Sequence, residues 1–153
     1  MNKITSRFLS ISATKMFFLS ILIVPSLFWY YAIAYQLDRK INPKNNSSKT
    51  IVLLVLLSYC LIYFFSFICV IFSVFQPVNF TVFDTLFIFH LLAVACTLTL
   101  IIVATRSFTQ YEAYIGEKTL TTFDAFWNLS SQLYGVWNIQ PKLNEYIKEK
   151  PSL

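Results

Sequence analysis

Histidine, cysteine and carboxylate side chains are the groups of this 153-residue chain that could do chemistry, and the single histidine is the most informative. His90 lies inside an apolar run, where an ionisable residue is often functional, and histidine changes its protonation state near neutral pH. Counting helical turns places His90 level with Cys69 and Ser73. We favour a neutral ring hydrogen-bonded to Ser73 or to a backbone carbonyl, and a proton or ligand site is the alternative.

The other reactive side chains form no pattern that supports catalysis. All three cysteines fall inside apolar runs, where thiols usually behave as small apolar residues. Three carboxylates follow in a polar stretch, and we expect them to be solvated rather than to act on lipid head groups. These residues are Cys60, Cys69, Cys96, Glu112, Glu117 and Asp124. Because H-E-x-x-H, C-x-x-C and Gly-rich phosphate motifs are also missing from the sequence, we expect no enzymatic activity and no cofactor or metal.

The element that holds His90 is an apolar stretch from Thr50 to Thr105, whose single charge is Asp84. Ile51–Phe75 has 25 uncharged residues, or about 37 Å of helix, and Thr85–Thr105 has 21. A hydrocarbon core is about 30 Å thick, so each segment is long enough to cross it. The sequence therefore predicts a hairpin of two transmembrane helices, with Asp84 capping the N-terminus of the second helix.

Two further segments are predicted to lie in or on the membrane. Met16–Tyr35 is an apolar run interrupted by Pro25, and we expect it either to span or to enter and return. Residues 120–140 have the amphipathic pattern of an interfacial helix, and the residues from Lys142 onward are expected to form a solvated tail. The aromatic face of that helix comprises Leu120, Phe123, Phe126, Trp127, Leu133, Tyr134 and Trp137, and Asp124, Asn128, Ser131 and Gln132 lie opposite.

Small residues recur along one face of each predicted span. Such residues let membrane helices approach closely, and their hydroxyls can bond across the gap. We expect this surface to serve packing within the hairpin. Its members are Ser58, Ser66, Cys69 and Ser73 in the first span, and His90, Ala93, Thr97 and Ala104 in the second.

Composition and charge favour one membrane domain over residues 1–153, with the lipid bilayer rather than nucleic acid as its partner. The sequence is 57% hydrophobic and 12% charged, whereas soluble domains carry roughly 25% charged residues. If the first segment re-enters and the last stays interfacial, all twelve Lys and Arg residues lie on one side of the bilayer and Asp84 lies on the other. The positive-inside rule prefers this arrangement, with cytoplasmic termini, over a three-span alternative.

Two motifs stand in the C-terminal half: an H-L-x-A-x-x-C span from His90 to Cys96, and a closing motif from Gly135 to Asn144 that reads G-V-W-N-I-Q-P-K-L-N. Over about residues 87–147 the chain resembles uncharacterised small bacterial integral membrane proteins that end in G-[IV]-W-x-[IL]-Q-P-[KR]-[IL]-N. The resemblance implies a bacterial inner (plasma) membrane location. The acid-free first 15 residues also suit a mitochondrial presequence, so the mitochondrial inner membrane is the alternative.

The closing motif is predicted to lie at the membrane interface. We expect Gly135 to permit a bend and Trp137 to anchor among the head groups. We expect Pro141, after Gln140, to end the helix, and Lys142 to meet lipid phosphate.

Together these features predict an all-α, polytopic helical membrane protein: a central transmembrane hairpin, a Pro-broken N-terminal membrane segment and a C-terminal aromatic amphipathic helix. The expected function is that of a non-enzymatic packing or accessory component of a homo-oligomer or a larger membrane complex. One alternative is a transport or channel component that uses His90. The other is a membrane immunity or stress factor that acts against a pore-former.

Overall fold

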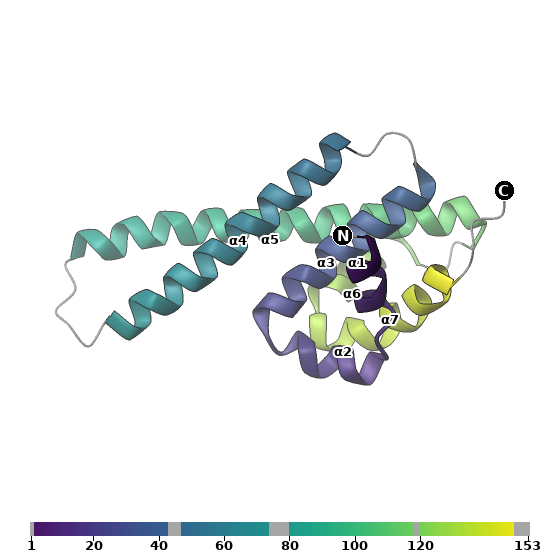
Figure 1. Cartoon of the computed structure of the whole chain (residues 1–153), viewed down its shortest axis with the longest axis horizontal. Helices are drawn as coiled ribbons and strands as arrows, with labels where there is room; N and C mark the ends of the chain where they lie inside the picture. The colour runs from purple at the N-terminus through teal and green to yellow at the C-terminus, as the bar shows by residue number, and fades with distance from the viewer. Residues whose placement is uncertain (1, 43–46, 74–79, 118–119, 149–153) are drawn as a thin grey trace.

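The computed structural model describes residues 2–42, 47–73, 80–117 and 120–148 of the chain (Figure 1). Over these ranges the chain is all helical, without a strand, which confirms the all-α prediction. The seven helices are α1 (Asn2–Leu9), α2 (Ala13–Ser20), α3 (Ile23–Ile41), α4 (Ser47–Ser73), α5 (Phe80–Ile115), α6 (Thr122–Ser130) and α7 (Gln132–Lys148).

One long helix organises the molecule. α5 runs along the whole length of the protein, and α4 lies antiparallel beside its first part to form a hairpin (Figure 1). The other helices gather as a bundle against the second part of α5, with α3 in the most extensive contact. The hairpin therefore projects from a helical bundle.

The hairpin contains two helices that are long and apolar enough to cross a membrane. The qualifying stretches are Lys49–Cys69 in α4, with 21 residues, and Phe87–Ile115 in α5, with 29. They overlap the predicted spans 51–75 and 85–105, although residues 74 and 75 lie outside the described residues.

The two ends of α5 differ from the prediction. The helix begins at Phe80, so Asp84 is its fifth residue and is not the N-cap, which precedes the first helical residue. The side chain of Asp84 lies outside the part that the structure describes. At the other end α5 continues ten residues beyond Thr105, because no glycine or proline intervenes before Gly116. Gly116 has a φ of 80°, the left-handed conformation with which glycine commonly ends a helix.

The predicted membrane segment 16–35 is not one element. The chain forms α2 and α3 across it, with a break at residues 21–22. Pro25 lies in the first turn of α3, where its missing N–H removes no helix hydrogen bond. The side chains of residues 26–38 are buried, apart from half-buried Phe28. A helix that is apolar on nearly all sides belongs in an interior, and here the surrounding helices supply that interior. The predicted single segment is therefore corrected to two helices, of which α3 forms the centre of the bundle.

The predicted interfacial helix over 120–140 is also two helices, α6 and α7, which meet at Ser131. Thr121 caps α6, since its hydroxyl oxygen accepts the backbone N–H of Asp124 at 3.1 Å. Most of the predicted aromatic face is exposed, whereas Leu120 and Phe126 pack on the core. The exposed members are Phe123, Trp127, Leu133, Tyr134 and Trp137. The core side consists of Ala125, Leu129, Val136, Ile139, Leu143 and Tyr146.

α7 continues past the predicted end of the helix. Pro141 lies inside α7 instead of ending it, and the helix runs to Lys148. Residues 142–148 are therefore not a solvated tail. The side chains of Leu143 and Tyr146 are buried in the core beyond the proline, and this packing holds the last turns of α7 in place.

Candidate functional site

The partner of His90 is a tyrosine of α4. The Tyr63 hydroxyl lies 2.8 Å from His90 Nδ1, and the two ring centroids are 5.6 Å apart. The ring of Phe67 lies 6.5 Å from the His90 ring on the other side. The structure thus brings His90 to Tyr63, and the predicted contact with Ser73 falls on a side chain outside the described residues. Cys69 is exposed.

The contact between α4 and α5 joins Cys60 of α4 to predicted small residues of α5. Cys60 Sγ lies 3.9 Å from the Ala93 carbonyl oxygen and 3.6 Å from Thr97 Oγ1. Ala93 and Ala104 are buried, and Thr97 is half-buried. On α4 the buried residues are Leu53, Leu57 and Cys60, whereas the predicted Ser58, Ser66 and Cys69 are exposed. The exposure of Ser58, Ser66 and Cys69 contradicts the prediction that they pack within the hairpin, and the larger side chains of Leu53 and Leu57 are buried in their place.

Gly135 of the closing motif is a point of close approach between α6 and α7. A Cβ atom at this position would lie 1.5 Å from the carbonyl oxygen of Asn128 and 2.4 Å from its carbonyl carbon. Asn138 Nδ2 also donates to Asn128 Oδ1 at 2.8 Å. Gly135 therefore lets two helices touch, in place of the bend that was predicted.

Gln140 is fully buried inside the bundle. Its Nε2 donates to the carbonyl oxygens of Leu9, at 2.7 Å, and Ile11, at 2.9 Å. Its Oε1 accepts a hydrogen bond from Trp29 Nε1 at 2.8 Å. One side-chain amide thereby ties α7 to α3 and to the connection between α1 and α2. Trp137, the predicted anchor, has an exposed ring, whose centroid lies 5.7 Å from that of Phe17.

Lys142 of the same motif meets a protein carboxylate rather than being held out toward lipid phosphate. Lys142 Nζ lies 3.4 Å from Oε1 of Glu112, whose side chain is fully buried. The Tyr146 hydroxyl donates to the same oxygen at 3.1 Å, and Leu120 N–H donates to Oε2 at 3.3 Å. Burial, followed by the negative charge of Glu112, raises the pKa of Tyr146 above its usual value. Glu112 is thus a buried structural charge, contrary to the expectation of a solvated one.

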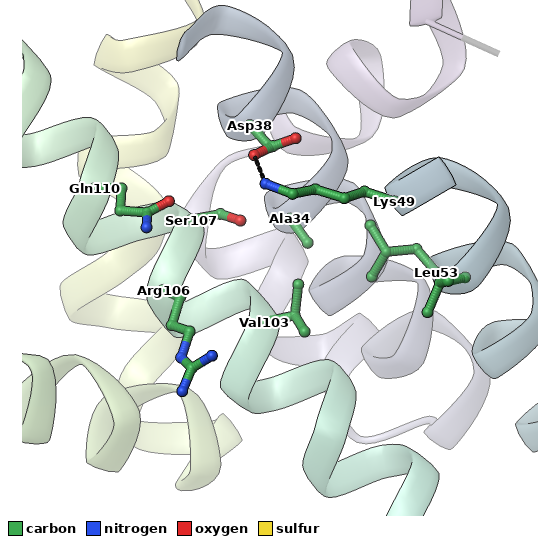
Figure 2. Close-up of a pocket in the computed structure, with 9 residues that line it drawn as sticks. Ala34, Asp38, Lys49, Leu53, Val103, Arg106, Ser107 and Gln110 are labelled. Carbon is green, nitrogen blue, oxygen red and sulfur yellow. Dashed lines mark hydrogen bonds and ion pairs between the residues drawn. The ribbon is translucent and has the colours of Figure 1, made fainter. Parts of the chain in front are cut away.

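A pocket at the base of the hairpin, here called the base pocket, was not predicted. It has a volume of about 390 Å³ and lies where α3, α4 and α5 meet (Figure 2). Its polar lining is Asp38, Lys49, Arg106, Ser107 and Gln110, and its apolar lining is Ala34, Val52, Leu53 and Val103. Lys49 Nζ lies 3.0 Å from Asp38 Oδ1, and Arg106 points away from this pair (Figure 2).

A sequence signal for the base pocket exists. Lys49 directly precedes the apolar stretch from Thr50 to Thr105, and Arg106 directly follows it. Closing an antiparallel hairpin brings the two flanking cations to the same end. Asp38 gives no comparable signal, because only the packing of α3 brings its carboxylate to this end.

The fold defines a helical protein in which an apolar hairpin projects from a bundle whose hydrophobic core encloses hydrogen-bonded polar side chains. Within the described ranges, no three His, Cys, Asp or Glu side chains come together as possible metal ligands. No protein-family model matches this chain, and neither a curated protein nor a solved structure matches it.

Proposed function

We propose that this protein is a small integral membrane protein without catalytic activity, which acts by helix packing as a component of a homo-oligomer or a larger membrane complex. The observation that carries the proposal is the exposure of the hairpin: only 17% of the apolar window of α4 and 22% of that of α5 are buried. The core helix of a soluble protein would be mostly buried. A signal sequence would stand near the N-terminus, whereas α4 begins at Ser47.

The exposed apolar surface of the hairpin has the extent that a bilayer requires. From Lys49 to Ser73, α4 is about 36 Å long, against a hydrocarbon core of about 30 Å. Water-exposed apolar area of this size would cost free energy at roughly 25 cal/mol for each Å², and lipid removes that cost. The exposed residues include Ile51, Val55, Ile62, Phe65 and Ile71 on α4, and Phe87, Ile88, Leu91, Val94 and Leu98 on α5.

The basic residues support one orientation. Each lysine and arginine in the described ranges lies in the bundle or at the base of the hairpin, namely Lys3, Arg7, Lys15, Arg39, Lys40, Lys49, Arg106, Lys142 and Lys148. By the positive-inside rule the bundle is cytoplasmic, and the end of α4 at Ser73 and the start of α5 at Phe80 lie on the opposite side of the membrane. The resemblance of residues 87–147 to small bacterial membrane proteins supports the bacterial inner membrane as the location.

Cysteine labelling tests the spanning orientation. Ser10→Cys places a thiol on the exposed surface of the bundle, and Asn79→Cys places one between α4 and α5. We expect an impermeant maleimide to label Asn79→Cys in intact cells and Ser10→Cys only in inverted vesicles, and the protein to stay in the membrane pellet after alkaline carbonate. Labelling of both thiols from the same side, or release by carbonate, would contradict the spanning hairpin.

The exposed small-residue face of α4 supports packing with a further helix. Ser58, Ser66 and Cys69 lie on the side of α4 opposite Leu57 and Cys60, which pack toward the rest of the chain. In a bilayer, small and hydroxyl-bearing side chains favour close helix contact, which for this face requires a helix from another subunit. Three carboxylates are engaged within the chain: Asp38 and Glu112 pair with lysines, and Asp124 accepts the Thr121 hydroxyl.

Oxidative crosslinking of native membranes tests the self-association. Because Cys69 lies on the small-residue face, we expect a dimer on mild oxidation and none from Cys69→Ser. Val94→Cys in the Cys69→Ser background is the matched control, since it places an exposed thiol on α5 instead. Equal crosslinking through both positions would indicate random collision and would overturn the assignment of this face. An adduct of Cys69 with another protein alone would favour the larger complex over the homo-oligomer.

A further inference from the structure

The base pocket joins a charged rim to an apolar wall. Lys49 and Arg106 form the rim, and Val52 and Val103 lie one helical turn further into the apolar runs. Both helices run from this point toward the tip of the hairpin (Figure 1). The wall therefore continues into the exposed apolar surface of the hairpin, for example at Val55 of α4.

The charges on the rim leave an excess of one positive charge. Asp38 is largely buried and lies 3.0 Å from the Lys49 ammonium, whose side chain is 64% exposed and therefore keeps part of its surface available. The guanidinium of Arg106 points away from Asp38, and it makes no hydrogen bond or ion pair with any residue in the described part of the chain. Ser107 and Gln110 add a hydroxyl and an amide to the same rim.

We infer that the base pocket binds the head group of an anionic phospholipid. Arg106 holds the phosphodiester in the two-bonded geometry that guanidinium and phosphate favour, and the Lys49 ammonium adds its positive charge to the rim from a distance. The acyl chains then follow Val52 and Val103 onto the hairpin. This inference rests on the proposed bilayer-spanning hairpin, because only insertion places the rim at the depth of the head groups.

The rim favours an anionic over a zwitterionic lipid. A choline group would bring a cation beside Lys49 and Arg106, and the one carboxylate in the pocket, Asp38, is already paired. A glycerol head group adds no charge and offers hydroxyls to Gln110 and Ser107. A soluble phosphate compound could bind the same rim, but it has no acyl chain to contact the apolar wall. Competition between the lipid and a soluble phosphate therefore distinguishes the two ligands.

Native mass spectrometry of the full chain tests the inference. The protein is released from nanodiscs made of equal parts of dioleoylphosphatidylglycerol and dioleoylphosphatidylcholine. We expect retained phosphatidylglycerol on the wild type and a loss of affinity of about tenfold for Arg106→Gln, the scale of a hydrogen-bonded charge pair. Lys15→Gln is the matched control, because it removes one positive charge from an exposed position on α2, and we expect it to retain the lipid as the wild type does.

Each outcome decides the inference. Equal retention of both lipids, or equal losses in Arg106→Gln and Lys15→Gln, would overturn it. Displacement of the lipid by excess glycerol 3-phosphate would assign the rim to a soluble phosphate ligand instead. Lys49→Gln would also remove a positive charge from the rim, but it breaks the contact with Asp38 and can misfold for that reason. Arg106→Gln therefore carries the test. Carbonate extraction of cell membranes that contain the same variants tests the hairpin separately. A protein that stays in the membrane without selecting phosphatidylglycerol disproves the lipid site alone. A protein that carbonate extracts disproves the proposed function too.

Discussion

Replacing Gly135 with alanine is expected to destabilise the bundle by roughly 3 kcal/mol or more, at the upper end of overpacking effects. The added Cβ would lie 1.5 Å from the Asn128 carbonyl oxygen, so the backbones of α6 and α7 must move apart. Alanine has a higher helix propensity than glycine, worth about 1 kcal/mol, but this gain is smaller than the cost of separating two packed helices. Thermal unfolding in detergent, followed by circular dichroism, measures the loss.

Gly116→Ala is the matched control for this prediction. A Cβ at Gly116 meets nothing within 4 Å, so the cost comes only from its φ of 80°. That conformation costs an alanine about 1–2 kcal/mol. We therefore expect Gly116→Ala to lose clearly less stability than Gly135→Ala. The reverse order would show that contact with Asn128 is not what selects glycine at position 135.

Replacing Gln140 with leucine is expected to cost about 3 kcal/mol, because each buried polar group left without a partner costs about 1–3 kcal/mol and leucine offsets only part of this by its apolar character. The substitution removes the acceptor of Trp29 Nε1 and the donor to the Leu9 and Ile11 carbonyls. The side chains have similar volumes, so packing alone would predict a small effect. A red shift of tryptophan fluorescence should accompany the lower unfolding temperature.

Two further variants show whether the lost hydrogen bonds cause the effect. Asn138→Leu removes one exposed hydrogen bond from the same helix, and we expect a change within about 0.5 kcal/mol. Trp29→Phe removes the indole donor, so the double variant with Gln140→Leu should lose less than the sum of the two single losses. Additive losses would mean that Trp29 and Gln140 are not coupled.

The closing motif shows that one sequence pattern is compatible with different surroundings. Gly135, Gln140 and Lys142 make contacts inside the bundle, whereas the pattern alone favours a membrane interface. A polar residue on an amphipathic helix has the same appearance in sequence whether its partner is water, a lipid or a buried carbonyl. The deciding partners of Gln140 lie more than a hundred residues away along the chain.

The prediction that the small-residue face of α4 packs against α5 differs from the structure for a related reason. Spacing places Ser58, Ser66 and Cys69 on one side of the helix, but it does not say which side faces α5. The rotation of α4 depends on how Leu53 and Leu57 fit the small residues of a helix some forty positions away. The same rotation turns Tyr63 toward α5, where its hydroxyl lies beside His90.

The sequence by itself determined the helical class, the two long apolar helices and the gathering of basic residues outside them. These properties follow from the composition and the length of apolar segments, which depend on residues that are neighbours in the sequence. Only the tertiary structure decided that α3 is a buried core helix, that Gln140 and Glu112 are interior polar groups, and that Lys49 and Arg106 share a pocket with Asp38. The burial of a side chain and its hydrogen-bond partners depend on segments that are distant in the sequence, so they are fixed only when those segments pack together.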